Sequence, residues 1–236
     1  MENGYNIRRR KSLLRFFDNV VKRAKPVLAS EFGDAGAEGI LSLARVEFDH
    51  ILPKMPYIGD SIFSRRLMGG GVFLSLYFAL RKKGYSVEES GETVLVAGKA
   101  FFRSWSPVTR RAAGRVIALN YRIHGSSASE KSLDGYYPGD WKFTYERGNG
   151  RDFMFRFTFT ECGMCKMVKK LGAEEATPWF CRLDHMIGEE LGILFSRAGV
   201  LSAGDPVCDW IYTGFGNATY SLPAGAGKGK RTVHEN

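Results

Sequence analysis

Residues 153–165 read FMFRFTFTECGMC, and this stretch decides the fold of the second half of the chain. From Phe153 to Phe159 every second residue is a phenylalanine, so a β-strand places all four rings on one face. Such a face predicts a strand that packs on a hydrophobic core. A helical pattern starts just after Cys162, so the strand is expected to run directly into a helix.

The segments on either side of this stretch predict three more strands and a second helix. Residues 141–145 also alternate, and Gly148-Asn149-Gly150 is a turn signal, so the first two strands form a hairpin. Periodicity then predicts two helices and two strands, over residues 163–171, 177–191, 194–201 and 207–213. The order ββααββ is typical of an α+β unit with a four-stranded antiparallel sheet.

The first half has a helical pattern throughout. Helices are predicted over residues 1–28, 34–51, 62–83, 87–103 and 106–123. Ser86 and Glu89 form a capping-box pattern, and Ser106-Pro107 is an N-cap followed by proline at the first helical position. The glycine run 69–71 predicts close helix packing or a helix break. Residues 124–135 are Gly/Ser-rich and predict a loop.

These patterns predict a helical N-terminal half packed on the sheet. The expected division is a helical region over 1–135, an α+β region over 136–221 and a disordered tail over 222–236. All four cysteines lie in the second region.

Composition and charge exclude some classes of function. The net charge is +9, but most of it lies at the two ends, so nucleic-acid binding is not favoured. The longest apolar run, residues 67–80, is too short for a membrane span and suits a buried helix. No export signal is visible, which with four cysteines predicts reduced thiols in the cytoplasm. A homodimer that forms through the basic N-terminal helix is possible on this sequence.

Cys162 and Cys165 form a C-x-x-C pair where the strand meets the helix. Backbone N–H groups and the helix dipole lower the pKa of a cysteine at such a position and favour the thiolate. A thiolate serves as a nucleophile or as a ligand for a soft metal. The alternative is a pair of small buried apolar residues.

The four cysteines have the spacing C-x2-C-x15-C-x26-C. Structural zinc sites usually bring two close pairs, and here the second pair is split. We therefore expect no cofactor, and keep as the alternative a zinc ion held by Cys162, Cys165, Cys181 and Cys208.

Four other residues are candidates for proton transfer or substrate binding. Asp184 and His185 follow Cys181 on one predicted helix and are candidate acid/base groups, although His185 also suits an exposed polar face. Arg197 lies between apolar neighbours and either binds a substrate carboxylate or pairs with an acidic side chain. Cys181, Cys208 and Glu161 complete the expected substrate-binding set, although strand alternation also allows Glu161 to point away from the cysteines.

Several strings in the chain resemble the L-2-amino-thiazoline-4-carboxylic acid hydrolase family in order and spacing, over roughly residues 40–212. They are Leu52-Pro53-x-x-Pro56-Tyr57-Ile58-Gly59, Tyr137-Pro138-Gly139-Asp140-Trp141, Thr160-Glu161-Cys162-Gly163-Met164-Cys165-Lys166, Gly172-Ala173-Glu174-Glu175, Cys181-Arg182-Leu183-Asp184 and Gly204-Asp205-x-x-Cys208-Asp209. The second half is also similar to the vinyl-reductase-type small-molecule-binding domains of ligand-sensing regulators.

The resemblance implies a hydrolase that opens a small cyclic isothiourea with a carboxylate, as in the conversion of 2-aminothiazoline-4-carboxylate to N-carbamoyl-cysteine. With the cysteine pair, it predicts a cysteine nucleophile. The alternatives are a non-catalytic small-molecule-binding module and a zinc-dependent hydrolase that uses the same cysteines. The chain has Ile211 where the family pattern Cys-Asp-Phe-Arg-Phe has arginine, which indicates a different substrate.

Overall fold

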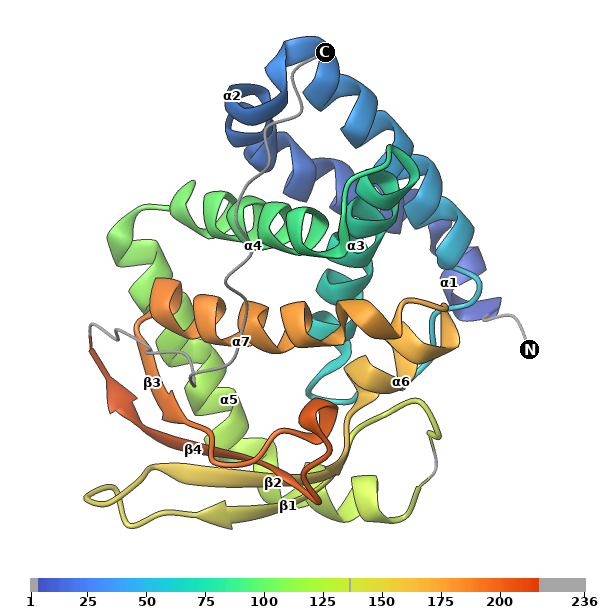
Figure 1. The fold of residues 1–236 in the computed structure, drawn as a ribbon. Coiled ribbons are helices and arrows are strands. Elements are labelled where there is room, and N and C mark those ends of the chain that lie inside the picture. The colour runs from blue at the N-terminus through green and yellow to red at the C-terminus, as the bar shows by residue number, and fades with distance from the viewer. Residues whose placement is uncertain (1–3, 136, 217–236) are drawn as a thin grey trace.

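A four-stranded antiparallel sheet lies along one side of the molecule, and the helices cover one of its faces (Figure 1). The computed structural model describes residues 4–135 and 137–216. The sheet has the order β1-β2-β4-β3 and its strands are β1 Lys142–Arg147, β2 Phe155–Glu161, β3 Ile193–Ser196 and β4 Cys208–Phe215. The predicted α+β class and the ββααββ order are confirmed. The tail predicted over 222–236 lies outside the described residues.

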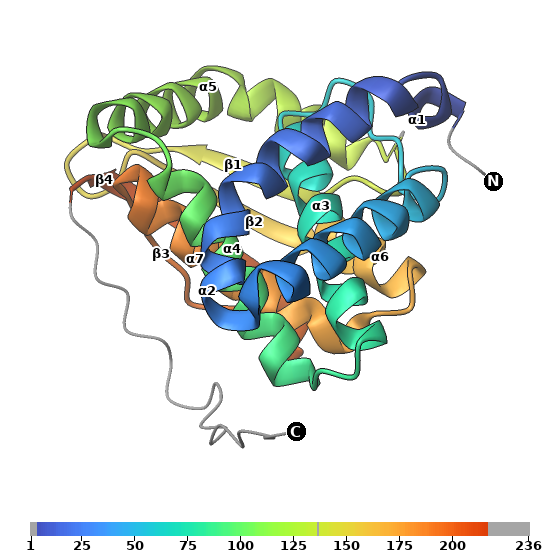
Figure 2. The same cartoon turned by 90° about the horizontal axis from the view of Figure 1, so that it is seen from above.

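Seven α-helices are present in the described part of the chain. They are α1 Gly4–Arg8, α2 Arg10–Ile51, α3 Ser64–Lys82, α4 Val87–Arg103, α5 Pro107–Leu133, α6 Gly163–Lys170 and α7 Thr177–Leu191. Helix α5 packs on β1, and α7 lies between α4 and the sheet (Figure 1). Helices α2, α3 and α4 pack on one another farther from the strands (Figure 2). No helix in the described part of the chain is long and apolar enough to cross a membrane.

The phenylalanine alternation produces the predicted aromatic face. The strand begins at Phe155 rather than Phe153, and the rings of Phe155, Phe157 and Phe159 are fully buried. Phe63, just before α3, lies on this face with its ring centroid 5.7 Å from those of Phe157 and Phe159. Aromatic pairs at such distances add stabilisation beyond their buried area. This contact joins the helical half to the sheet.

Helix α5 is longer than the sequence predicts. The loop expected over 124–135 is wrong, because the helix continues to Leu133. Its small residues are the reason: the hydroxyls of Ser129 and Ser132 donate to the carbonyl of Phe143, at 3.0 and 3.1 Å. Gly125 lets the ring of Tyr145 approach the helix, since a Cβ there would lie 2.3 Å from that ring. The residues that look like a loop are the ones that let α5 pack closely on β1.

Two other predicted elements differ in their limits. The strand expected over 194–201 ends at Ser196, where the carboxylate of Asp209 accepts the backbone N–H groups of Ala198 and Gly199 at 2.8 Å. The first two predicted helices are joined in α2, with a break in helical geometry at Gly33, whose φ is 72°.

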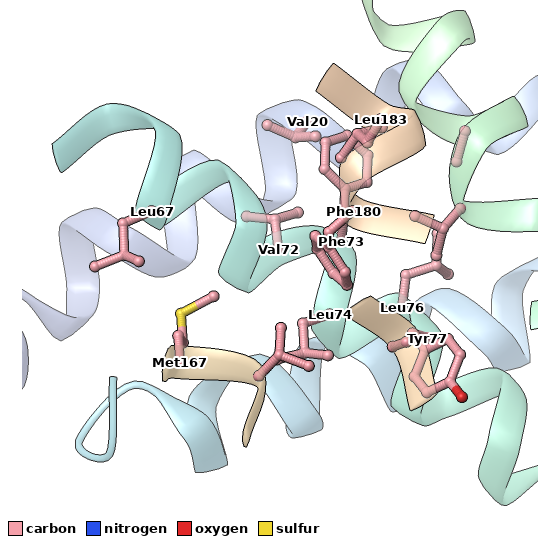
Figure 3. Packing of buried hydrophobic residues seen from close by; sticks show 14 of the residues in the cluster. Val20, Leu67, Val72, Phe73, Leu74, Leu76, Tyr77, Met167, Phe180 and Leu183 are labelled. Carbon is pink, nitrogen blue, oxygen red and sulfur yellow. The ribbon is translucent and has the colours of Figure 1, made fainter. Parts of the chain in front are cut away.

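The predicted caps and close packing are confirmed. Ser86 accepts the backbone N–H of Glu89 at 3.1 Å, and Glu89 accepts that of Ser86 at 2.8 Å. A Cβ at Gly70 would lie 2.3 Å from Met164, so the glycine run does allow close packing. Figure 3 shows Phe73 of α3 in one hydrophobic cluster with Phe180 of α7. The cluster continues through both halves of the chain.

Gly114→Ala is expected to destabilise the protein. A Cβ at this position would lie 2.3 Å from the carbonyl oxygen of Leu191, a backbone atom that cannot turn aside, so α5 must move away from α7. The expected loss in the free energy of unfolding is about 1–3 kcal/mol, measured by urea denaturation.

Gly69→Ala is the matched control. It is also inside a helix, but no atom lies within 4 Å of its Cβ, so the variant should be neutral or more stable by up to about 1 kcal/mol. Equal stability of the two variants would contradict the close approach of α5 and α7.

Candidate active site

One cavity of about 1400 Å³ lies between the aromatic face of the sheet and helices α3, α5 and α7. Most of the residues that the sequence singles out line it. They are Cys162, Cys165, Cys181, Asp184, Arg197 and Cys208. Two others, His185 and Glu161, do not line it.

Cys162 is the residue before α6, and its extended backbone directs the chain from β2 into the helix. The side chain of Cys165 and the backbone N–H groups of Cys165 and Met164 favour the thiolate form of Cys162, although they form no regular capping hydrogen bond with it. These donors outweigh burial and lower the pKa of Cys162 to about 7. Cys162 therefore carries substantial thiolate character at neutral pH.

The other three cysteines are poor thiolates. The hydrogen bond to Cys162 and burial raise the pKa of Cys165. Burial raises the pKa of Cys181 to about 11, and its sulfur lies 3.2 Å from the hydroxyl of Ser202. Burial also raises the pKa of Cys208, against the opposing effect of the positive charge on Arg197. The pKa of Cys162 is thus lowered, whereas the pKa values of the other three cysteines are raised.

Two arginines share one carboxylate in the wall of the cavity. Asp184 Oδ1 lies 3.2 Å from Arg66 Nη1, and Asp184 Oδ2 lies 3.3 Å from Arg197 Nη2. Both guanidinium groups stack on Trp210, at 4.3 and 4.9 Å from its ring centroid. The predicted pairing of Arg197 with an acidic side chain is therefore present, and the sequence-based candidates did not include Arg66.

This group carries one positive charge more than its single carboxylate neutralises. The Arg197 side chain is 2% exposed, and its Nε has no hydrogen-bond partner among the described residues. Arg66 Nη1 is buried and also lacks a partner of hydrogen-bond geometry there. Burial is the largest single effect on Arg66 and works against its charged form, but Asp184 together with Tyr121, Tyr212 and Cys162 outweighs it, so the pKa of Arg66 is raised. Unused donors and excess positive charge in a buried wall favour an anionic ligand.

Two tyrosines complete the polar part of the cavity. Burial raises the pKa of Tyr121 and of Tyr212, so both phenols are protonated at neutral pH. The positive charge of Arg66 opposes this rise in the pKa of Tyr121. Both are neutral hydrogen-bond donors that the sequence-based candidates did not include.

The side chains of His185 and Glu161 lie outside the lining of this cavity. The His185 ring stacks on Phe195, with centroids 5.0 Å apart and planes at 15°. Burial, and then Arg197, lower the pKa of His185 to about 4, so it is neutral at physiological pH. Glu161 forms an ion pair with Lys166 on the outer side of the cysteine pair, and this contact lowers its pKa.

The cysteine pair separates the cavity from a second, shallower depression of about 500 Å³. Cys162 and Cys165 line both hollows, and Lys166 and Ser202 line the outer one. No three His, Cys, Asp or Glu side chains of the described residues are placed to hold a metal ion together, and this includes the four cysteines of the zinc alternative.

The sequence did contain weak signals for the residues that it missed. Arg66 directly precedes the long apolar run 67–80, so a charged side chain lies at the N-terminal end of a helix that is predicted to be buried. Trp210 and Tyr212 follow Cys208 at strand spacing, so they share its face of β4. No local pattern shows that Arg66 and this face meet.

Iodoacetamide is expected to modify Cys162 before the other cysteines of the folded protein. The thiolate is the reactive form, so the rate should rise with pH through about 7, the pKa of Cys162. Peptide mass spectrometry of a time course measures this rate. Cys181, with its pKa of about 11, is the internal control. Equal rates for the two cysteines at neutral pH would show that Cys162 is not activated.

Comparison with known proteins identifies the family. No curated protein and no solved structure matches the chain significantly. A family model, described as L-2-amino-thiazoline-4-carboxylic acid hydrolase, matches residues 66–212. The match covers more than half of the chain, begins at Arg66 and ends at Tyr212, and thus includes all of the polar groups described above. The chain therefore belongs to the L-2-amino-thiazoline-4-carboxylic acid hydrolase family, a family of hydrolases named for action on a thiazoline ring.

Proposed function

We propose that this protein hydrolyses a small cyclic amidine or isothiourea that carries a carboxylate, of the 2-aminothiazoline-4-carboxylate type, with Cys162 as the nucleophile. The observation that carries this proposal is a single activated thiolate in the same cavity as an arginine pair with excess positive charge. Family membership supports the reaction class.

The arginine pair binds the substrate carboxylate. Arg197 Nε offers a buried donor without a partner among the described residues, and the two guanidinium groups share a single carboxylate, Asp184, which favours a second carboxylate beside them. Guanidinium–carboxylate bonds are strong and directional, so they also orient the ring. Stacking on Trp210 fixes both guanidinium planes before the substrate arrives.

The reaction proceeds in two displacements. The Cys162 thiolate adds to the ring carbon that bears the exocyclic nitrogen, and the bond from this carbon to the ring sulfur breaks. The ring sulfur leaves as a thiolate, and the carbon stays bound to Cys162. Water then attacks that carbon, Cys162 leaves as a thiolate, and the product is a carbamoyl group. The protons that water releases pass to the product's nitrogen and thiolate. Covalent attack divides one hard hydrolysis into two easier steps.

Asp184 and His185 have different roles in this proposal. Of these two predicted acid/base candidates, only Asp184 lines the cavity. Both oxygens of the Asp184 carboxylate lie against guanidinium groups, so we assign Asp184 to positioning Arg66 and Arg197. A thiolate leaving group needs little help from a general acid, and the Tyr121 phenol is available as a donor.

Cys162→Ala is expected to lower kcat for 2-aminothiazoline-4-carboxylate by at least about a thousandfold without unfolding the protein, because the nucleophile is lost. Product formation by chromatography and thermal unfolding are the two measurements. In the wild type, kcat/KM should rise with pH through about 7, because deprotonation of Cys162 creates the active form. Cys181→Ser, which changes another cysteine of the same cavity, should stay active.

Other outcomes identify the alternatives. Ligand binding without product at high enzyme concentration would indicate a non-catalytic binding module, as in the vinyl-reductase-type domains. Activity that is lost together with one equivalent of zinc on chelation would indicate the zinc-dependent hydrolase.

Arg197→Gln is expected to raise KM for the carboxylate substrate by about tenfold to a hundredfold, because a charged hydrogen bond is lost. The same variant should discriminate less against the corresponding carboxamide. Steady-state kinetics with both compounds measures this.

Arg182→Gln is the matched control, because Arg182 also stacks on a tryptophan, Trp179 at 4.4 Å, and pairs with an acid, Glu92 at 3.1 Å. Arg182 does not line the cavity, so its loss should leave KM unchanged. Equal effects of the two variants would contradict carboxylate binding by Arg197.

A further inference from the structure

The cavity continues well beyond the arginines and cysteines, into an arm between α2, α4 and α5. We call it the aromatic arm, and its walls are Phe16, Phe101, Phe102, Trp105, Val116 and Ile117. The arm and the polar site belong to one continuous space.

The α4 side of the arm is a packed aromatic group. The ring centroids of Phe101, Phe102 and Trp105 lie 5.1 to 5.6 Å from one another. Each ring contacts the other two, so the surface is held in place before any ligand binds. A preformed apolar surface binds an apolar group with little loss of conformational entropy.

The facing side of the arm exposes apolar side chains to the space. Phe16 of α2 is 38% exposed, and Val116 and Ile117 of α5 are 67% and 36% exposed. Large apolar side chains that remain exposed along a concave surface indicate a binding site for an apolar group. The total volume of about 1400 Å³ also exceeds what one five-membered ring with its carboxylate requires.

We propose that the natural substrate carries an aryl or alkyl extension, and that this extension lies in the aromatic arm while the carboxylate binds at Arg66 and Arg197. The head group in this proposal rests on the proposed function. Trp105 and Ile117 then determine specificity for the extension, and they have no part in the chemistry. The substrate class is an amphipathic cyclic isothiourea carboxylate.

A series of 2-(alkylamino)- and 2-(arylamino)-thiazoline-4-carboxylates tests the proposal. For the wild type, kcat/KM should rise by about tenfold or more from the unsubstituted compound to the hexyl and benzyl derivatives, because apolar surface is buried. Trp105→Ala should remove most of this gain and leave the unsubstituted compound unaffected. Val108→Ala is the control: Val108 is near the same end of α5, is 78% exposed and does not line the cavity.

A second variant keeps the test valid if Trp105→Ala does not fold. Ile117→Trp fills the arm from a partly exposed position, so it should reduce kcat/KM for the benzyl compound and spare the unsubstituted one. Equal kcat/KM across the series in the wild type would overturn the proposal.

Binding measurements separate this inference from the proposed function. Calorimetry with 2-alkylthiazole-4-carboxylates, which have an aromatic ring that resists attack, reports on binding alone. If no thiazoline is hydrolysed but affinity still rises with alkyl length and falls in Ile117→Trp, the arm is supported and the hydrolase is not. If thiazolines are hydrolysed and alkyl length changes neither affinity nor kcat/KM, the hydrolase stands and the arm is refuted.

Discussion

The paired contacts of Asp184 with Arg66 and Arg197 are the interaction on which the site depends. Arg66 belongs to α3 of the helical half, Asp184 to α7, and Arg197 follows β3, so one carboxylate joins the two halves around the cavity. Buried charges are costly unless they are paired, and here two guanidinium groups share one carboxylate. The same arrangement that holds the halves together therefore leaves a place for an anion.

The aromatic face of the sheet strengthens the electrostatic interactions of Arg66 and Arg197. Phe63, Phe157 and Phe159 pack on one another as a buried apolar layer next to the site, and both guanidinium groups stack on the ring of Trp210. In such a low-dielectric environment, the attraction between two opposite charges is stronger than in water. The packing that stabilises the fold thus also strengthens recognition of a carboxylate.

The cysteine pair shows how a junction between two elements creates chemistry. Because β2 ends at Glu161 and α6 begins at Gly163, Cys162 lies where unpaired backbone N–H groups of a helix point outward. The neighbouring thiol of Cys165 favours the thiolate of Cys162, and the pKa of Cys165 is raised in turn. The pair also lies between the inner cavity and the outer depression, which gives the sulfur access to both.

Sequence by itself determined the features that depend on a few neighbouring residues: the alternation that makes β2, the cap of α4 by Ser86 and Glu89, and the place of Cys162 at a helix start. Periodicity and capping act over one or two turns, so they can be seen in a single chain. Only the tertiary structure decided which distant residues meet. It extended α5 through a stretch that looks like a loop, because Ser129 and Ser132 bond to Phe143 of β1. It brought Arg66 to Asp184, and it turned α7 so that Asp184 faces the cavity while the adjacent His185 packs on Phe195. The rotation of a helix about its axis is set by packing with its neighbours, and no local pattern contains that information.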